Sequence, residues 1–321
     1  MLQSDAIFDA AVLTAVGTKM PRTSWHALRH REVFAPPLQE QRQIAAILDT
    51  IDDAIRKTEQ IIAKLKHVKQ GLLHDVLTRG IDKNGELRDP ERHPEQFKDS
   101  PLGPIPCGWR ATTVGELLAE QALIAVQDGN HGEAHPKRDD FVTEGIPFVM
   151  ANNLRDGKVD VASCYKITRR QYESLRVGFA APGDVLLSHK GTMGETALVD
   201  ASLTELMLTP QVTYYRPNST ALHGGYLCCW FNGPALQKQL AALSVQSTRA
   251  FLSITGQRQL CVAVPPLCEQ PEIANRLSAL NDQFVVEQFG LAKMRVLKMG
   301  LMEELLTGRM RVTDLLPSAA Q

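Results

Sequence analysis

One segment of this 321-residue chain occurs twice. The stretch PPLQEQRQIAAIL begins at Pro36, and PPLCEQPEIANRL begins at Pro265, 229 positions later. Residues 36–80 align onto residues 265–309 without a gap. Two copies at such a long period do not make a solenoid, in which many short repeats stack on one another. The chain therefore uses one structural segment twice.

Both copies predict a long α-helix. Their apolar residues recur every three or four positions, which is the spacing of one helical face. A Pro-Pro pair can precede or begin a helix but cannot lie inside it, and Gly80 can end the first copy. About 40 residues in this conformation span roughly 60 Å. We expect these side chains to pack between the helices: Ile44, Leu48, Ile51, Ile55, Ile62, Leu65, Leu72, Ile273, Leu277, Leu280, Phe284, Leu291, Met294, Leu301 and Leu305.

A long helix with one apolar face must bury that face, and two copies of the same face suggest each other. We therefore predict an antiparallel two-helix coiled coil. Thr58 and Glu287 interrupt the apolar face at the same place in both copies, so the packing is imperfect there. The alternative is two unrelated amphipathic helices on separate cores, although packing alone does not require the shared PPLxEQ start.

The sequence between the two copies changes character. Residues 81–109 are rich in charge, Pro and Gly, which indicates an extended connector. Residues 110–264 hold short runs typical of β-strands between turn signals, and a helix is expected at 224–243. The runs lie at residues 146–150, 184–188, 197–199 and 211–215. We predict an α+β fold, with one globular mixed α/β domain at 110–264 beside the two long helices.

Residues 1–35 weakly echo the end of that domain under the same shift of 229 positions. We interpret them as the C-terminal remnant of a first domain of this kind. The predicted order is then this remnant, a helix at 36–80, the connector, the domain, a helix at 265–312 and a tail at 313–321. Such an order indicates a chain that begins inside a longer two-domain plan, and it leaves open whether Met1 is the true start.

Composition argues against several classes of protein. No run approaches the roughly 18 apolar residues of a membrane helix, and the N-terminus does not resemble a secretory signal. The six cysteines form no CxxC pair, so we expect free thiols in a reducing cytoplasm rather than structural zinc. A net charge of −1 is unlike that of a protein that binds nucleic acid strongly by itself.

Motifs for catalysis are missing as well. The chain has no GxGxxG after a strand, no phosphate-binding P-loop, no GxSxG and no Asn-Pro-Pro-aromatic segment. His74 and Asp75 lie on the predicted first helix, where a solvated face explains them. We expect no catalytic residues, no bound metal and no cofactor of its own.

An ordered set of segments carries a family resemblance. The set is PPLQEQRQIAAILDTID, LLHDVLTRGI, DSPLGPIPCGW, GDVLLSHKGTMGETALV and VPPLCEQPEIANRL, and the matches run from about residue 15 to 312. The chain resembles the specificity subunit of type I restriction–modification systems. It departs from that family in lacking all but the last stretch of a first recognition domain, as in a truncated or half-sized subunit.

The resemblance implies a function. Each target recognition domain would read half of a split site in double-stranded DNA, and the helices would set the spacing. Methyltransferase subunits would dock on the helices and supply S-adenosylmethionine, and a separate translocase and restriction subunit would use ATP and Mg²⁺ to cut. A half-sized subunit could restore two recognition domains by pairing with itself. Membrane binding is not expected, and the location would be the cytoplasm.

DNA contact requires cations for phosphates and amide or guanidinium groups for base edges. The domain at 110–264 offers three clusters and one further arginine, each of which could equally be ordinary surface charge or turn chemistry. The candidates are Asn152, Asn153 and Arg155; Lys166, Arg169 and Arg170; Ser188, His189, Lys190 and Thr192; and Arg249. The family resemblance, rather than the charge, favours DNA.

Two functions from different classes stay open at this stage. A recognition subunit would bind DNA selectively once a methyltransferase partner is present. A truncated structural adaptor would bind its partners without DNA selectivity. An independent nuclease or methyltransferase would require a catalytic site that the sequence does not contain.

Overall fold

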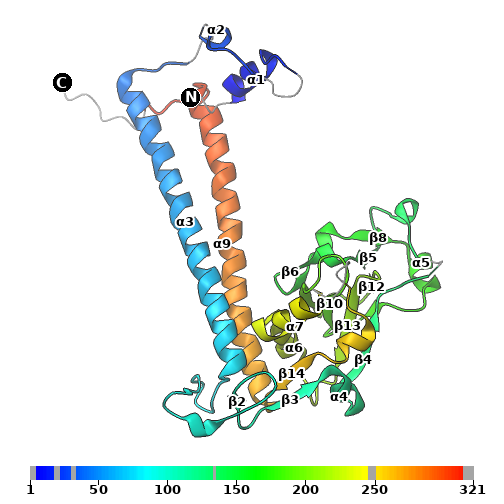
Figure 1. Ribbon diagram of the computed structural model, residues 1–321. Helices are drawn as coiled ribbons and strands as arrows, with labels where there is room; N and C mark the ends of the chain where they lie inside the picture. The colour runs from blue at the N-terminus through cyan, green and yellow to red at the C-terminus, as the bar shows by residue number, and fades with distance from the viewer. Residues whose placement is uncertain (1–4, 18–21, 30–33, 133–134, 245–250, 314–321) are drawn as a thin grey trace. The chain divides into compact units, whose positions relative to one another are not determined.

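The computed structural model describes residues 5–17, 22–29, 34–132, 135–244 and 251–313. The chain forms two compact units (Figure 1). Unit 1 comprises residues 1–67 and 282–321, and unit 2 comprises residues 68–281. Within the described residues, no helix is long and apolar enough to cross a membrane.

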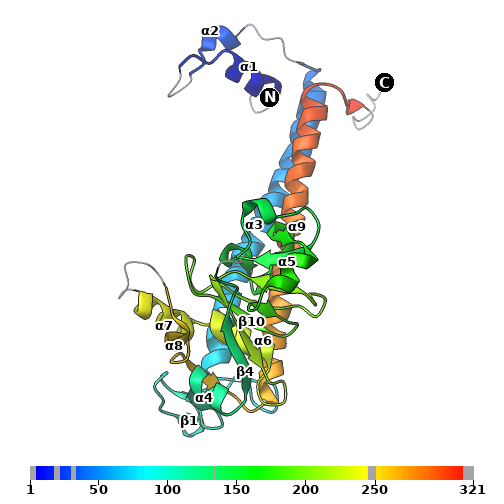
Figure 2. The same cartoon turned by 90° about the vertical axis from the view of Figure 1, so that its right-hand side faces the viewer.

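Two long helices, α3 (Leu38–Thr78) and α9 (Glu269–Leu306), run side by side in both views (Figures 1 and 2). In unit 1, Glu59 pairs with Arg295 at 2.7 Å and Asp52 with Lys298 at 2.5 Å. Ile44 and Leu305 share one buried cluster. Residue numbers rise along one helix as they fall along the other, so the helices are antiparallel. This confirms the predicted pairing of the two copies.

The PPLxEQ segments explain why the helices begin where they do. The Gln41 side chain donates to the Pro36 carbonyl at 2.7 Å, and Gln270 donates to the Pro265 carbonyl at 2.9 Å. The same hydrogen bond therefore fixes the start of each helix. In unit 2, the Gln270 oxygen also accepts the backbone N–H of His223 at 2.7 Å, which links α9 to the mixed domain.

The described residues of unit 2 form two four-stranded sheets and three two-stranded ones. The first large sheet has the order β11–β10–β13–β4 and is antiparallel throughout. The second has the order β8–β5–β12–β9, in which only β5 and β12 are parallel. The strands of unit 2 are β1 Phe97–Lys98, β2 Ile105–Pro106, β3 Arg110–Thr113, β4 Leu123–Asp128, β5 Ile146–Val149, β6 Leu154–Arg155, β7 Lys158–Val159, β8 Tyr165–Ile167, β9 Phe179–Ala180, β10 Val185–Ser188, β11 Thr196–Leu198, β12 Leu206–Leu208, β13 Val212–Pro217 and β14 Cys261–Val264.

Shorter helices complete both units. Unit 1 has α1 (Asp5–Leu13) and α2 (Trp25–Leu28). The helices of unit 2 are α4 Val114–Ala119, α5 Arg169–Ser174, α6 Gly224–Asn232, α7 Pro234–Ser244 and α8 Ile254–Gln257, with 3-10 turns at Pro94–Gln96, Arg138–Asp140, Ala151–Asn153 and Val161–Ser163. The single helix expected at 224–243 is wrong in one respect, because it is broken at Gly233. Pro234 lacks the N–H that a continuous helix needs there and begins α7 instead.

The main core of unit 2 lies where the first sheet meets α6, α7 and the ends of the long helices. Trp109 and Tyr226 are fully buried and meet edge to face, with ring centroids 6.3 Å apart. Val76 and Ile273, from α3 and α9, belong to the same cluster. Each such side chain contributes about 1.5–3 kcal/mol by leaving water. Trp109 also shows that the end of the predicted connector is packed into the core rather than solvated.

Candidate nucleic-acid interface

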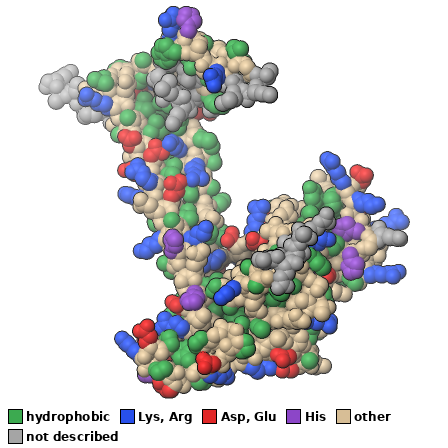
Figure 3. All heavy atoms as spheres, in the orientation of Figure 1, with side chains coloured by type: hydrophobic (Ala, Val, Ile, Leu, Met, Phe, Trp, Pro, Cys, Tyr) green, Lys and Arg blue, Asp and Glu red, His purple; other side chains and the backbone are tan. Residues whose placement is uncertain are grey.

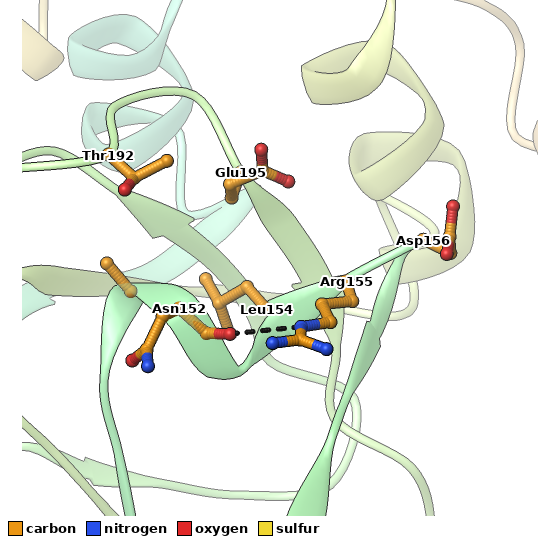
Figure 4. A pocket seen from close by; sticks show the side chains of 7 residues that line it. Asn152, Leu154, Arg155, Asp156, Thr192 and Glu195 are labelled. Atoms are coloured by element: carbon orange, nitrogen blue, oxygen red, sulfur yellow. Dashed lines mark hydrogen bonds between the residues drawn. The ribbon is translucent and has the colours of Figure 1, made fainter. Parts of the chain in front are cut away.

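Two of the three predicted clusters meet at one shallow pocket of about 350 Å³ in unit 2 (Figure 4). Asn152 and Arg155 come from the turn and short strand after β5, and Thr192 comes from the loop between β10 and β11. The Arg155 Nε donates to the Asn152 carbonyl at 3.2 Å, which holds the two residues together. The guanidinium remains exposed. The remaining lining residues are Ala151, Leu154, Asp156 and Glu195.

The loop that presents Lys190 and Thr192 depends on glycine. Gly191 and Gly194 have φ values of +81° and +98°, a left-handed conformation that other residues adopt at a cost. The Gly194 carbonyl accepts the Gln237 side-chain amide at 2.9 Å, and the Ser188 hydroxyl accepts the Glu195 N–H at 2.9 Å. Both ends of the loop are therefore fixed, and Lys190 and Thr192 stay exposed between them.

Three predicted residues are buried instead. Asn153 is 2% exposed and bridges the Met150 N–H and the Ser163 hydroxyl, at 2.8 and 3.0 Å. Ser188 is fully buried beneath the loop. Their side chains face the interior in this structure, so they shape the surface rather than form it. The sequence pattern alone did not separate these two from their exposed neighbours.

His189 is the third buried candidate, at 1% exposure. Its Nδ1 lies 3.0 Å from the Leu252 carbonyl, and its Nε2 lies 3.4 Å from the Asp128 carboxylate. Burial lowers the pKa of His189 despite the nearby negative charge of Asp128. The buried ring therefore links β10 to the segment that leads into α8.

The second predicted cluster lies on the other large sheet. Lys166 is half-buried in β8, and Arg170 is exposed on α5. Arg169 is already engaged, because its guanidinium binds both oxygens of Glu205 at 2.9 and 2.5 Å. That carboxylate raises the pKa of Arg169. Lys166 and Arg170 are thus better placed than Arg169 to meet a phosphate.

The structure adds a group near Lys166 that the sequence reasoning missed. The Phe141 and Tyr165 rings stack with centroids 4.4 Å apart and planes 9° apart, and Tyr165 remains 54% exposed. Lys137 and Arg138 are exposed on the loop just before Phe141. Lys and Arg side chains gather around this β8–α5 end of unit 2 (Figure 3). The run HPKRDD, with two adjacent cations before an aromatic residue, was the available signal.

Two sets of predicted residues remain, Arg249 and the side chains that were predicted to pack between the long helices. Arg249 lies outside the described residues. Every predicted helix-packing side chain is buried or half-buried, from Ile44 to Leu305. Across the described residues, no group of three His, Cys, Asp or Glu side chains could hold a metal ion, and all six cysteines are free thiols.

Comparison with known proteins points to one family. Residues 7–67 match the family described as the type I restriction modification DNA specificity domain. The MjaVIII specificity subunit of Methanocaldococcus jannaschii is 21% identical over 305 residues, which cover 93% of this chain and 67% of that protein. The EcoBI specificity subunit of Escherichia coli is 25% identical over 252 residues, covering 76% of this chain and 50% of that protein.

Solved structures share the fold. The type I restriction–modification S subunit from M. genitalium has a TM-score of 0.58 at 14% identity, over 92% of this chain and 68% of that one. A chain from a structural study of complex assembly and conformational transition in a type I R-M system has a TM-score of 0.56 at 19% identity, over 96% of this chain and 69% of that one. The chain spans between half and two-thirds of the length of the curated relatives it matches.

Proposed function

We propose that the chain is a specificity subunit of the type I restriction–modification kind, the family to which its similarities point, and that it reads part of a bipartite DNA target through residues 110–264. Members of this family are non-catalytic recognition components. S-adenosylmethionine, ATP and Mg²⁺ would therefore belong to the methyltransferase and restriction subunits that complete the complex. The proposed site of action is the cytoplasm.

One observation carries the proposal for DNA. Asn152 and Arg155 from one segment and Thr192 from another lie around a single pocket, and Lys190 is exposed on the same loop as Thr192. Amide and guanidinium groups can each make two hydrogen bonds to a base edge, and lysine can neutralise phosphate. The carboxylates of Asp156 and Glu195 line the same pocket and would repel a phosphate group. This mixture of basic, amide and acidic side chains favours contact with base edges over binding by attraction to phosphates alone.

The repeated helices support docking of methyltransferase subunits. Leu38 and Leu267 occupy equivalent positions in the two copies, and both are exposed. Val68 and Leu297 form a second such pair, again with both side chains exposed. A partner that treats the two copies alike would use features that both copies share. We therefore assign these apolar side chains to that partner.

The test is selective DNA binding by the chain reconstituted with its methyltransferase subunits. Fluorescence anisotropy would compare a cognate duplex with a scrambled one, for the wild type and for Asn152→Ala with Arg155→Ala. We expect the double variant to lose at least about 10-fold of its selectivity, because one good base contact is worth about 1–3 kcal/mol. Arg169→Ala is the matched control, since Arg169 is engaged by Glu205.

Unchanged selectivity in the double variant would contradict this placement of the interface. A complex that assembles but never discriminates between duplexes would indicate the structural adaptor instead.

A further inference from the structure

The two copies of the repeat hold an equivalent pair of side chains across the long helices. In unit 1, Lys298 of α9 pairs with Asp52 of α3 at 2.5 Å. The shift of 229 positions relates this pair to Lys69 of α3 and Asn281 of α9 in unit 2, where the Lys69 ammonium donates to the Asn281 Oδ1 at 2.6 Å. The lysine is the same in both copies, but its partner is a carboxylate in one and an amide in the other.

An amide is a weaker partner for lysine than a carboxylate. Asn281 lacks the Coulomb attraction that Asp52 provides for its lysine. Asn281 is also only 7% exposed, and a buried amide needs partners for its N–H groups as well as for its oxygen. Pairing between the helices therefore does not account for the amide by itself.

The Asn281 nitrogen contacts the mixed domain. Its Nδ2 donates to the backbone carbonyl of Asp156 at 3.3 Å. Asp156 lies in the turn between β6 and β7, directly after Arg155, and both residues line the candidate pocket (Figure 4). An ionised carboxylate at position 281 could not donate this hydrogen bond, because it only accepts. The change from acid to amide between the two copies therefore matches the carbonyl that Asn281 meets in unit 2.

The turn that Asn281 contacts is short and is held by the first large sheet as well. Asp156 and Gly157 have φ values of +50° and +79°, as in the two-residue turns that close β-hairpins. The Gly157 carbonyl accepts the Leu198 N–H of β11 at 2.9 Å. Two successive carbonyls of the turn are thus fixed, one by a side chain of α9 and one by the sheet.

We propose that Asn281 is a positioning residue, which sets where Arg155 stands relative to the unit 2 end of α9. The inference rests on the proposed function, in which Arg155 contacts a base edge. Arg155 directly precedes the fixed turn, so a shift of the turn displaces its exposed guanidinium. Hydrogen bonds weaken steeply away from their preferred distance and angle, so a base contact tolerates little displacement. The hydrogen bond from Asn281 thereby ties this side chain to the helix as well as to the sheet.

The test measures selectivity between cognate and scrambled duplexes in the reconstituted complex, for the wild type, Asn281→Asp and Asn281→Ala. The first variant introduces the residue that the other copy has at this place, and the second removes the donor without adding a charge. We expect selectivity to fall about 10-fold in both, as for one lost base contact. Asp52→Asn is the matched control and should leave selectivity unchanged. A loss confined to the aspartate variant would attribute the effect to charge and overturn the proposal.

A double-mutant cycle separates positioning from a purely structural role. If Asn281 acts through Arg155, Asn281→Ala should lower selectivity by less than about 2-fold in an Arg155→Ala background. The Tm of Asn281→Ala should stay within about 3 °C of the wild type, because one network of two hydrogen bonds is lost. Additive losses of selectivity from the two changes would overturn the proposal.

Hydrogen exchange followed by mass spectrometry tests the contact in the full chain without DNA. Asn281→Ala should speed exchange of the backbone amides of residues 154–160 at least about 5-fold, while the peptide that contains β10 stays as protected as in the wild type. Unchanged exchange in the turn would overturn the positioning role, whatever the DNA assay shows. Faster exchange in the turn, together with a wild-type complex that never discriminates between duplexes, would support the Asn281 contact and contradict the proposed function instead.

Discussion

Glu40 and Glu269 occupy equivalent places in the two copies of the repeat, and each is a buried carboxylate that anchors the segment following the opposite long helix. Glu40 accepts two hydrogen bonds from Arg311, both at 2.7 Å, and one from the Val312 N–H at 3.3 Å. Glu269 accepts the Ile81 N–H at 2.7 Å and two hydrogen bonds from the Arg88 guanidinium. The repeated PPLxEQ motif therefore joins the start of one long helix to the segment that follows the other.

Removing Glu269 should destabilise unit 2. Its carboxylate also accepts the Trp109 indole N–H at 3.2 Å, so Glu269→Ala leaves a buried N–H and the Arg88 cation unpaired. We expect a loss of about 3 kcal/mol in the free energy of unfolding, measured by urea denaturation. Glu272→Ala is the control, because Glu272 pairs with Arg276 at an exposed helix surface and should cost less than about 0.5 kcal/mol. Equal losses in the two variants would contradict the anchoring role.

The Glu40 anchor should fail in acid. The hydrogen bonds from Arg311 lower the pKa of Glu40 in the folded chain. Its stabilisation is therefore fully present above the unfolded-state pKa of about 4.3, and it is lost as pH falls through the lower folded-state value. The difference in Tm between wild type and Glu40→Gln should be large at pH 7 and shrink towards pH 3. A difference that is constant with pH would contradict this linkage.

Thiol reactivity should report the packing of unit 2. Burial raises the pKa of Cys164 to about 12 and that of Cys228 to about 11, so neither forms the reactive thiolate near neutral pH. Cys107 and Cys268 are exposed. Iodoacetamide at pH 7.5, followed by peptide mass spectrometry, should label the two exposed cysteines first. Equally fast labelling of Cys228 in the folded chain would show that the core beneath β11 is open.

Lys190 should contribute charge rather than sequence selectivity. In the reconstituted complex, Lys190→Ala should weaken binding to cognate and scrambled duplexes by a similar factor. The slope of log affinity against log salt should fall by about one unit, as expected for one lost phosphate contact. Lys238→Ala, on α7, serves as a comparison cation outside the predicted clusters. A change in selectivity without a change in the salt-dependence slope would indicate that Lys190 contacts base edges rather than phosphates.

The sequence predicted the helices well because their signal is local. A periodic apolar face and a Pro-Pro start can be recognised without knowing the rest of the fold. The repeat indicated that the apolar face of one long helix packs on the apolar face of the other. The strands at 146–149 and 185–188 were likewise found from their own residues. The break between α6 and α7 also has a local signal, the Gly233-Pro234 pair.

The candidate site was less predictable because loop packing decides which polar side chains reach the surface. Asn153, Ser188 and His189 have the chemistry to contact DNA, yet tertiary hydrogen bonds bury all three. The aromatic stack of Phe141 on Tyr165 joins segments that are distant in the sequence. The link from Trp109 to Glu269 also spans elements whose proximity no local pattern encodes.

The most direct test of the account is a selection from random DNA duplexes. The chain would be reconstituted with its methyltransferase subunits, and the bound duplexes would be sequenced after several rounds. We predict one enriched sequence element that Asn152→Ala with Arg155→Ala weakens or changes, while Arg169→Ala leaves it intact. A bound pool with no enriched sequence, from a complex that has assembled, would contradict a DNA-reading role for residues 110–264.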